Sequence, residues 1–171
     1  DNELRVLFLS NLIESKGYLD VLEALGRLSS EGVPVRARFA GEFVCSVDDV
    51  TVHSADEARA RFEARIEELG LSERVEYLGP VSGNRKWQLL EDSHVFVLPT
   101  RYINEGQPVS IIEAMAYGCP VVTTRYRAIP DLVVEGETGQ FVEFGDVAGI
   151  AEALRELSSN PEAFETLSEA A

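Results

Sequence analysis

A strand leading into a short helix can be read from Val95-Phe96-Val97-Leu98-Pro99-Thr100 and, after a short loop, Glu105-Gly106-Gln107-Pro108-Val109-Ser110-Ile111-Ile112-Glu113-Ala114-Met115-Ala116. The first run is apolar and too short for a helix, which is typical of a buried strand. Pro108 suits the first turn of the helix, where its missing N–H costs nothing. Gly118 suits the position just past the helix end, and Pro120 cannot continue the helix. The sequence therefore predicts a short helix whose N-terminus lies beyond the end of a strand.

The rest of the chain repeats this alternation between apolar runs and helical periodicity. Strands are expected at residues 6–9, 35–40, 75–78, 95–98, 121–123 and around 141–142. Helical patterns are expected at residues 18–28, 56–69, 86–90, 109–117 and 147–157. Strands that alternate with helices form parallel sheets through right-handed crossovers. We therefore expect an α/β fold with a doubly wound, mostly parallel sheet of about six strands and helices on both faces, in a Rossmann-like arrangement.

A ligand site is expected at one edge of this sheet, because open α/β sheets bind ligands beyond the carboxyl ends of their strands. The loops that follow the strands there are residues 10–16, 41–44, 79–84, 100–107 and 124–127. The N-terminus of the helix at 109–117 offers free N–H groups and a partial positive charge, which suit phosphate or sugar oxygens. Glu105 precedes this helix and Glu113 lies on its second turn, so two carboxylates are expected near the opening of the same ligand site. Carboxylates accept hydrogen bonds from pairs of hydroxyls, as in ribose and hexose recognition.

Composition and charge exclude several classes of protein. At 171 residues the chain fits one domain with a real core. The net charge of −15 makes nucleic acid an unfavourable partner. No apolar run reaches the roughly 18 residues of a membrane span, and no signal peptide is recognisable. Cys45 and Cys119 lack metal or redox spacing and suit unpaired thiols in a reducing compartment, so a cytoplasmic location and no metal site are expected.

The balance of charged residues has two interpretations. Acidic residues number 30 and basic residues 15, of which only Lys16 and Lys86 are lysines. Excess acid with scarce lysine is typical of proteins adapted to high salt, where counterions screen self-repulsion. A GC-rich genome, which favours arginine over lysine, would leave the same pattern.

The two glutamates belong to a wider pattern. Glu105 and Glu113, with seven residues between them, resemble the E-x7-E motif of retaining glycosyltransferases of the GT-B fold, the family 4 or group 1 type. Further stretches similar to that family are residues 7–17, 75–80, 106–108, 113–122 and 136–139. The resemblance runs nearly end to end, but only over the family's C-terminal, donor-binding domain.

The resemblance implies a role for each matched residue. Glu105 would contact hydroxyls of the donor sugar, Glu113 would hold the ribose hydroxyls, and Lys16 would bind the diphosphate, which makes Glu105 and Lys16 the catalytic candidates. The other donor-binding candidates are the helix-entry residues Gly106, Gln107, Pro108 and Val109, together with Val81 in the loop that frames the base and Asn11. No metal is expected, because protein cations and helix dipoles take its place at the leaving diphosphate.

One position departs from the family pattern. Asn11 stands where the family carries an arginine five residues before the lysine, and Arg101 and Arg85 are the candidates for the missing cation.

The implied function is that of a glycosyltransferase donor domain, residues 1–171, which binds a nucleoside-diphosphate sugar. The chain enters its first strand almost at once, so we expect a separate N-terminal acceptor domain that is absent here, and no sugar transfer by the chain alone. A lipid-linked acceptor or a peripheral membrane location would come through that absent domain. The alternatives are a non-catalytic module that binds a nucleotide or phosphosugar, and a phosphorylase or epimerase of the same fold.

Overall fold

The computed structural model describes residues 3–160 and residue 169. Within this part of the chain six strands form one sheet, in the order β3-β2-β1-β4-β5-β6. They are β1 (Leu4–Leu9), β2 (Val35–Ala40), β3 (Val75–Gly79), β4 (Val95–Leu98), β5 (Val121–Thr123) and β6 (Gly139–Phe141). All neighbouring pairs are parallel, so the expected doubly wound α/β fold is confirmed, with a sheet that is wholly rather than mostly parallel.

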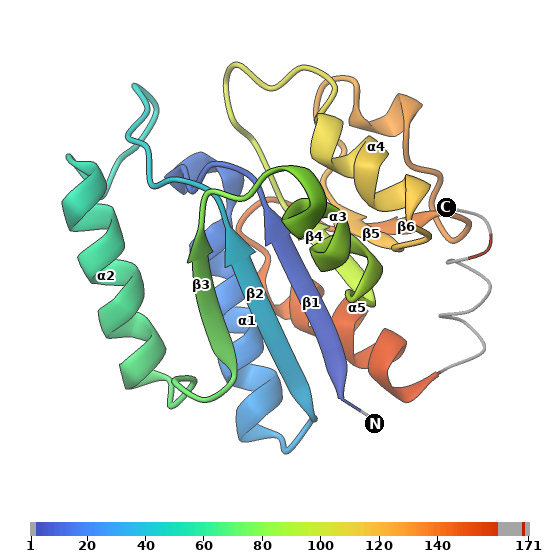
Figure 1. The fold of residues 1–171 in the computed structure, drawn as a ribbon, viewed down its shortest axis with the longest axis horizontal. Helices are drawn as coiled ribbons and strands as arrows, with labels where there is room; N and C mark the ends of the chain where they lie inside the picture. Colours follow the sequence, from blue (N-terminus) through green and yellow to red (C-terminus); the bar gives the residue numbers. More distant parts are fainter. Residues whose placement is uncertain (1–2, 161–168, 170–171) are drawn as a thin grey trace.

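Helices cover both faces of the sheet (Figure 1). They are α1 (Tyr18–Ser30), α2 (Ala55–Glu68), α3 (Gly83–Glu91), α4 (Val109–Ala116) and α5 (Val147–Ser159), with short 3-10 helices η1 (Glu14–Lys16) and η2 (Ile129–Asp131). The helices α3 and α4 lie on one face, and α1 lies on the other beside α5 and α2. In the described part of the chain, no helix is both long and apolar enough to cross a bilayer.

The ends of α4 agree only in part with the sequence expectation. Pro108 is not in the first turn: it is the N-cap, with extended backbone (φ −64°, ψ 112°), and its carbonyl accepts a hydrogen bond from the Ile111 N–H at 3.0 Å. Gly118 adopts the left-handed conformation (φ 68°) just past the helix, as predicted, because a residue without a Cβ does so without strain. The loop before α4 therefore runs through Pro108, and the helix dipole begins at Val109.

The helix α3 begins three residues before the predicted range, at Gly83. Its apolar signal comes from the later residues Trp87, Leu89 and Leu90, which pack against the core, so periodicity alone placed the start too late. Ser82 precedes the helix with extended backbone (φ −151°, ψ 169°).

The core lies on both sides of the central strands. Every residue of β4 is fully buried, as are Leu7 and Phe8 of β1, which explains why residues 95–98 and 6–9 form uninterrupted apolar runs in the sequence. Full burial of each such side chain contributes about 1.5–3 kcal/mol to folding. This rigid centre fixes the loops that leave β1 and β4. Because the winding of the sheet reverses between these two strands, their loops diverge to opposite sides and leave room for a ligand at the carboxyl edge.

Candidate functional site

The loop after β1 packs directly against the end of β4. Gly17, with φ 80°, closes η1, and a Cβ built there would lie 2.6 Å from the carbonyl oxygen of Pro99. The Arg101 N–H donates a hydrogen bond to the Ser15 carbonyl at 2.8 Å, which joins the two loops. A side chain at position 17 would push the loops apart, so this glycine sets how closely they approach.

Lys16 and Glu105 meet at this junction. The Lys16 Nζ lies 3.5 Å from Glu105 Oε2 and donates a hydrogen bond to Ser10 Oγ at 3.0 Å. Their side chains are only 13% and 7% exposed, so two opposite charges are held together away from most of the solvent. Removing charged groups from water is costly, and a pair of this kind is weak evidence for stability by itself. The pair is therefore a candidate contact for a polar ligand.

The Glu105 carboxylate is also held from below. Thr100, which is fully buried, donates a hydrogen bond from Oγ1 to Glu105 Oε2 at 2.8 Å and accepts one from the Tyr102 N–H at 3.0 Å. The Thr124 hydroxyl donates in turn to the Thr100 carbonyl. This chain of hydrogen bonds anchors Glu105 to the ends of β4 and β5. Sequence reasoning placed Thr100 in the right loop but did not identify it as the support of the carboxylate.

Glu113 lies on the second turn of α4, as predicted, and has a cationic partner that was not predicted. Lys86 of α3 approaches Glu113 Oε1 with its Nζ at 2.6 Å, and the two side chains are 22% and 20% exposed. A signal was present in the sequence: Lys86 is one of only two lysines and follows the loop expected to frame the base. The two lysines of the chain therefore each pair with one glutamate of the E-x7-E motif.

The remaining donor-binding candidates line the same edge of the sheet. Asn11 and Val81 share a hollow of about 250 Å³ formed where β1, β2 and β3 end, together with Ser10, Glu42 and Pro80. Val109 is 64% exposed, and Gly106 and Gln107 are exposed, whereas Pro108 is buried. The backbone around the start of α4 is therefore open to a ligand.

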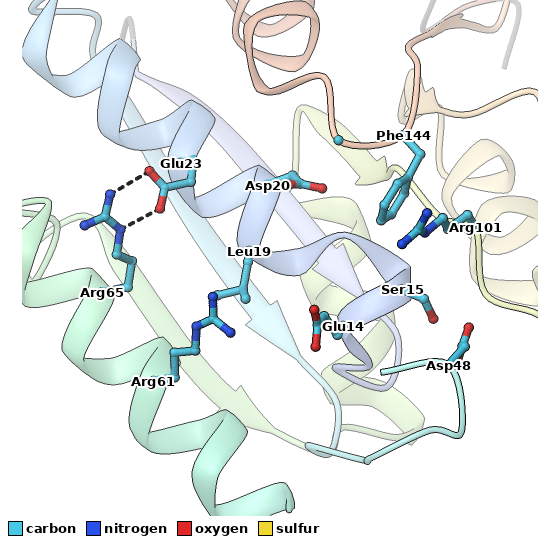
Figure 2. A pocket seen from close by; sticks show the side chains of 11 residues that line it. Glu14, Ser15, Leu19, Asp20, Glu23, Asp48, Arg61, Arg65, Arg101 and Phe144 are labelled. Carbon is cyan, nitrogen blue, oxygen red and sulfur yellow. Dashed lines mark hydrogen bonds and ion pairs between the residues drawn. The ribbon is translucent and has the colours of Figure 1, made fainter. Parts of the chain in front are cut away.

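Neither candidate for the missing cation, Arg101 or Arg85, forms an ion pair with Glu105. The Arg101 guanidinium carbon lies 4.2 Å from the centre of the Phe144 ring, in a separate hollow of about 320 Å³. Figure 2 shows this hollow, with Arg101 beside Phe144 on the side of Ser15. Arg85 is exposed on the first turn of α3. The Arg101 guanidinium therefore lies on Phe144 in this structure, and a role for Arg101 or Arg85 as the cation absent at Asn11 stays a prediction.

The charges around the Arg101 hollow do not favour binding of a diphosphate. Its charged lining residues are Glu14, Asp20, Glu23, Asp48, Arg61, Arg65 and Arg101. Across it, Arg65 is already engaged in two hydrogen bonds with the Glu23 carboxylate, at 2.5 and 2.9 Å (Figure 2). Burial raises the pKa of the Asp20 carboxyl, and the nearby Glu23 charge raises it further. Surroundings that already disfavour one more negative charge do not favour a diphosphate.

Comparison with known proteins decides the family. Residues 1–171 match the family model described as "Glycosyl transferases group 1". The chain belongs to this family. The putative colanic acid biosynthesis glycosyltransferase WcaL of Salmonella typhimurium is 32% identical over 159 residues, which cover 91% of this chain and 36% of WcaL. The capsular polysaccharide biosynthesis glycosyltransferase CapM of Staphylococcus aureus is 29% identical, over 94% of this chain and 38% of CapM. This group 1 chain thus spans little more than a third of the length of these relatives.

Solved structures share the fold. HepE of Anabaena, crystallised in complex with UDP, superposes with a TM-score of 0.83 at 22% identity, over 99% of this chain and 43% of HepE. The C-terminal domain of the group 1 protein LpcC of Francisella tularensis gives a TM-score of 0.81 at 20% identity, over 98% of this chain and 81% of that domain structure. At this level of identity the match establishes the architecture of the group 1 chain.

Proposed function

We propose that this chain is the donor-binding half of a retaining glycosyltransferase and holds a nucleoside-diphosphate sugar at the carboxyl edge of its sheet. The observation that carries the proposal is the junction of Lys16 and Glu105 beside the exposed start of α4. An ammonium group, a carboxylate and free helix amides converge there, which are the groups that a diphosphate and a sugar need. Structures of similar fold contain UDP and UDP-glucose, which supports the same class of ligand.

Each group has a distinct task in this proposal. In sugar transfer, the bond between the anomeric carbon and the diphosphate oxygen breaks, a bond from the anomeric carbon to the acceptor oxygen forms, and the acceptor hydroxyl gives up its proton. Negative charge grows on the leaving phosphate as its bond breaks. Lys16 stabilises that charge together with the N–H groups at the start of α4, and no metal ion is needed for it. Glu105 accepts hydrogen bonds from the sugar hydroxyls, and Glu113 accepts them from the ribose. The hollow at Asn11 and Val81 lies where the base would be framed.

The acceptor and the remaining catalytic groups belong, in this proposal, to the rest of a longer polypeptide. The coverage of relatives supports this: the matched region is 36% of WcaL and 38% of CapM. We infer that transfer requires that N-terminal acceptor domain, and that the acceptor is reached from the cytoplasm, with a lipid-linked acceptor bound through the other domain.

Ligand titration tests the proposal. The parent chain and Lys16→Met are titrated by calorimetry with UDP, GDP and ADP, with their glucose or mannose conjugates, and with glucose 1-phosphate. We expect binding of one diphosphate series, unchanged by EDTA, and a loss of about 10- to 100-fold in Lys16→Met, because a charge-assisted bond to phosphate is worth about 1.5–3 kcal/mol. Binding of none of the nucleotides would contradict the proposal.

A second candidate is the non-catalytic binding module. The observations that favour it are that Asn11 stands where the family carries an arginine and that the Arg101 guanidinium lies on the Phe144 ring. Preference for glucose 1-phosphate or a nucleoside monophosphate over every diphosphate sugar would select this alternative.

A further inference from the structure

Lys86 is placed so that it can control how Glu113 meets a ligand. The two side chains come from different helices, α3 and α4, and their charged ends approach to 2.6 Å. Both are about four-fifths buried. A glutamate side chain has three rotatable bonds, and a partner at hydrogen-bond distance removes most of that freedom before any ligand binds.

Aromatic contacts hold Lys86 in turn. Its ammonium group lies 4.3 Å from the centre of the neighbouring Trp87 ring, a favourable cation–π distance. The Trp87 ring stacks on Tyr117 at the end of α4, with ring centres 5.9 Å apart and planes 7° from parallel. The stack and the ion pair together fasten α3 to α4, so the position of Lys86 is set before ligand binding.

The pairing leaves a defined part of Glu113 available. Lys86 contacts Oε1, and an ionised carboxylate still has the lone pairs of Oε2 for hydroxyl donors. Two neighbouring ribose hydroxyls need a carboxylate whose plane faces them both. A carboxylate that rotates freely would face the two hydroxyls in only some of its conformations. Fixing it in the right orientation on binding would then cost free energy.

We propose that Lys86 is a positioning residue: it orients Glu113 toward the 2′- and 3′-hydroxyls of the bound ribose. The inference rests on the proposed binding of a nucleoside diphosphate and goes beyond it by assigning a task to a residue outside the E-x7-E motif. Because α3 follows the loop of Val81, the same residue links the loop beside the base to the carboxylate at the ribose.

The test separates orientation of the ribose from a general effect of charge or stability. Lys86→Met, Lys86→Arg and the parent are titrated with UDP, GDP and ADP, and then with the 2′,3′-dideoxy form of the diphosphate that the parent binds most tightly. Arg36→Met is the control, since it also removes a cation from an ion pair, with Glu3 at 3.3 Å, but at the amino end of the sheet. Circular dichroism checks that each variant is folded.

We expect Lys86→Met to bind the ribose ligand about 5- to 20-fold more weakly and the dideoxy ligand with a loss at least threefold smaller. Lys86→Arg should recover most of the affinity, and Arg36→Met should match the parent for both ligands. In a Glu113→Ala background, the loss of affinity that Lys86→Met causes should also be at least threefold smaller, because the residue through which Lys86 acts is gone.

Equal losses for the two ligands, or a loss that persists undiminished in Glu113→Ala, would overturn the positioning role and make Lys86 a direct ligand contact or a structural cation. No loss in Lys86→Met would overturn it as well. A parent chain that binds none of the diphosphates would instead overturn the proposed function, and the inference with it, so the two failures are distinguishable.

Discussion

The Lys16 Nζ lies 3.5 Å from Glu105 Oε2 at the point where the sheet reverses its winding. The other lysine forms a similar ion pair, with the Lys86 Nζ 2.6 Å from Glu113 Oε1. The chain contains no other lysine, and its net charge is −15. Elsewhere on this surface arginine provides the cations, as in the Arg65–Glu23 and Arg155–Glu31 pairs. A lysine ammonium is a compact charge with three rotatable donors, which suits phosphate and hydroxyl oxygens in a small site. Both lysines of the chain are therefore paired with glutamates of the candidate site.

Removal of Glu113 is expected to weaken nucleotide binding without unfolding the chain. A charge-assisted bond from a hydroxyl to a carboxylate is worth roughly 1.5–3 kcal/mol, and the loss of one such bond corresponds to about 10- to 100-fold in affinity, so Glu113→Ala should raise the dissociation constant of the nucleoside diphosphate by at least that factor. The fold should persist because alanine favours helices and position 113 lies at a partly exposed rim. Calorimetry measures the affinity. A folded Glu113→Ala that binds as tightly as the parent would show that the ribose assignment is wrong.

Glu105 is expected to distinguish the sugar from the nucleotide. Glu105→Ala should weaken binding of the nucleotide-sugar about 10-fold or more and leave the bare diphosphate within about threefold, because Glu105 meets only sugar hydroxyls in the proposed arrangement. Glu105→Gln keeps the shape and the hydrogen bond from Thr100, and controls for the loss of support at Lys16. Parallel titrations with both ligands decide the matter. A similar loss for both ligands would show that Glu105 acts on the diphosphate through Lys16 rather than on the sugar.

Salt is expected to stabilise the fold. Acidic residues outnumber basic ones by 30 to 15. Salt screens the repulsion between charges that are more than about 10 Å apart at 0.1 M and more than about 3 Å apart at 1 M. The exposed ion pairs, such as Arg59–Glu63, lose little on screening because each is worth about 0–1 kcal/mol. The melting temperature should therefore rise from near-zero to molar KCl. A flat or falling melting temperature would support the genomic explanation of the composition and reject salt adaptation.

The two cysteines are expected to react very differently. Both are free, as predicted; Cys119 is buried and Cys45 is exposed. Burial raises the pKa of the Cys119 thiol to about 11, so about one molecule in a thousand carries the thiolate at pH 8. Partial desolvation and then the Asp49 carboxylate raise the pKa of Cys45 above that of an ordinary thiol, so its reaction should keep speeding up as the pH is raised from neutral into the alkaline range. Ellman's reagent should label one thiol in the native chain and two after denaturation. Rapid native labelling of both would contradict the burial of Cys119.

Local patterns in the sequence determined the order of strands and helices, because alternation of short apolar runs with helical stripes is a property of neighbouring residues. They also located Glu105 before a helix and Glu113 on its second turn, and Gly118 marked its end. What only the tertiary structure decided is which side chains meet. Lys86 and Glu113 lie 27 residues apart on separate helices, and their contact depends on how α3 and α4 pack over the sheet. Arg101 follows β4 as closely in sequence as the site residues do, yet its guanidinium lies on Phe144, in another hollow. The direction of a side chain at the edge of a sheet is set by the packing of segments that are distant in the sequence. The periodicity of neighbouring residues therefore does not predict that direction.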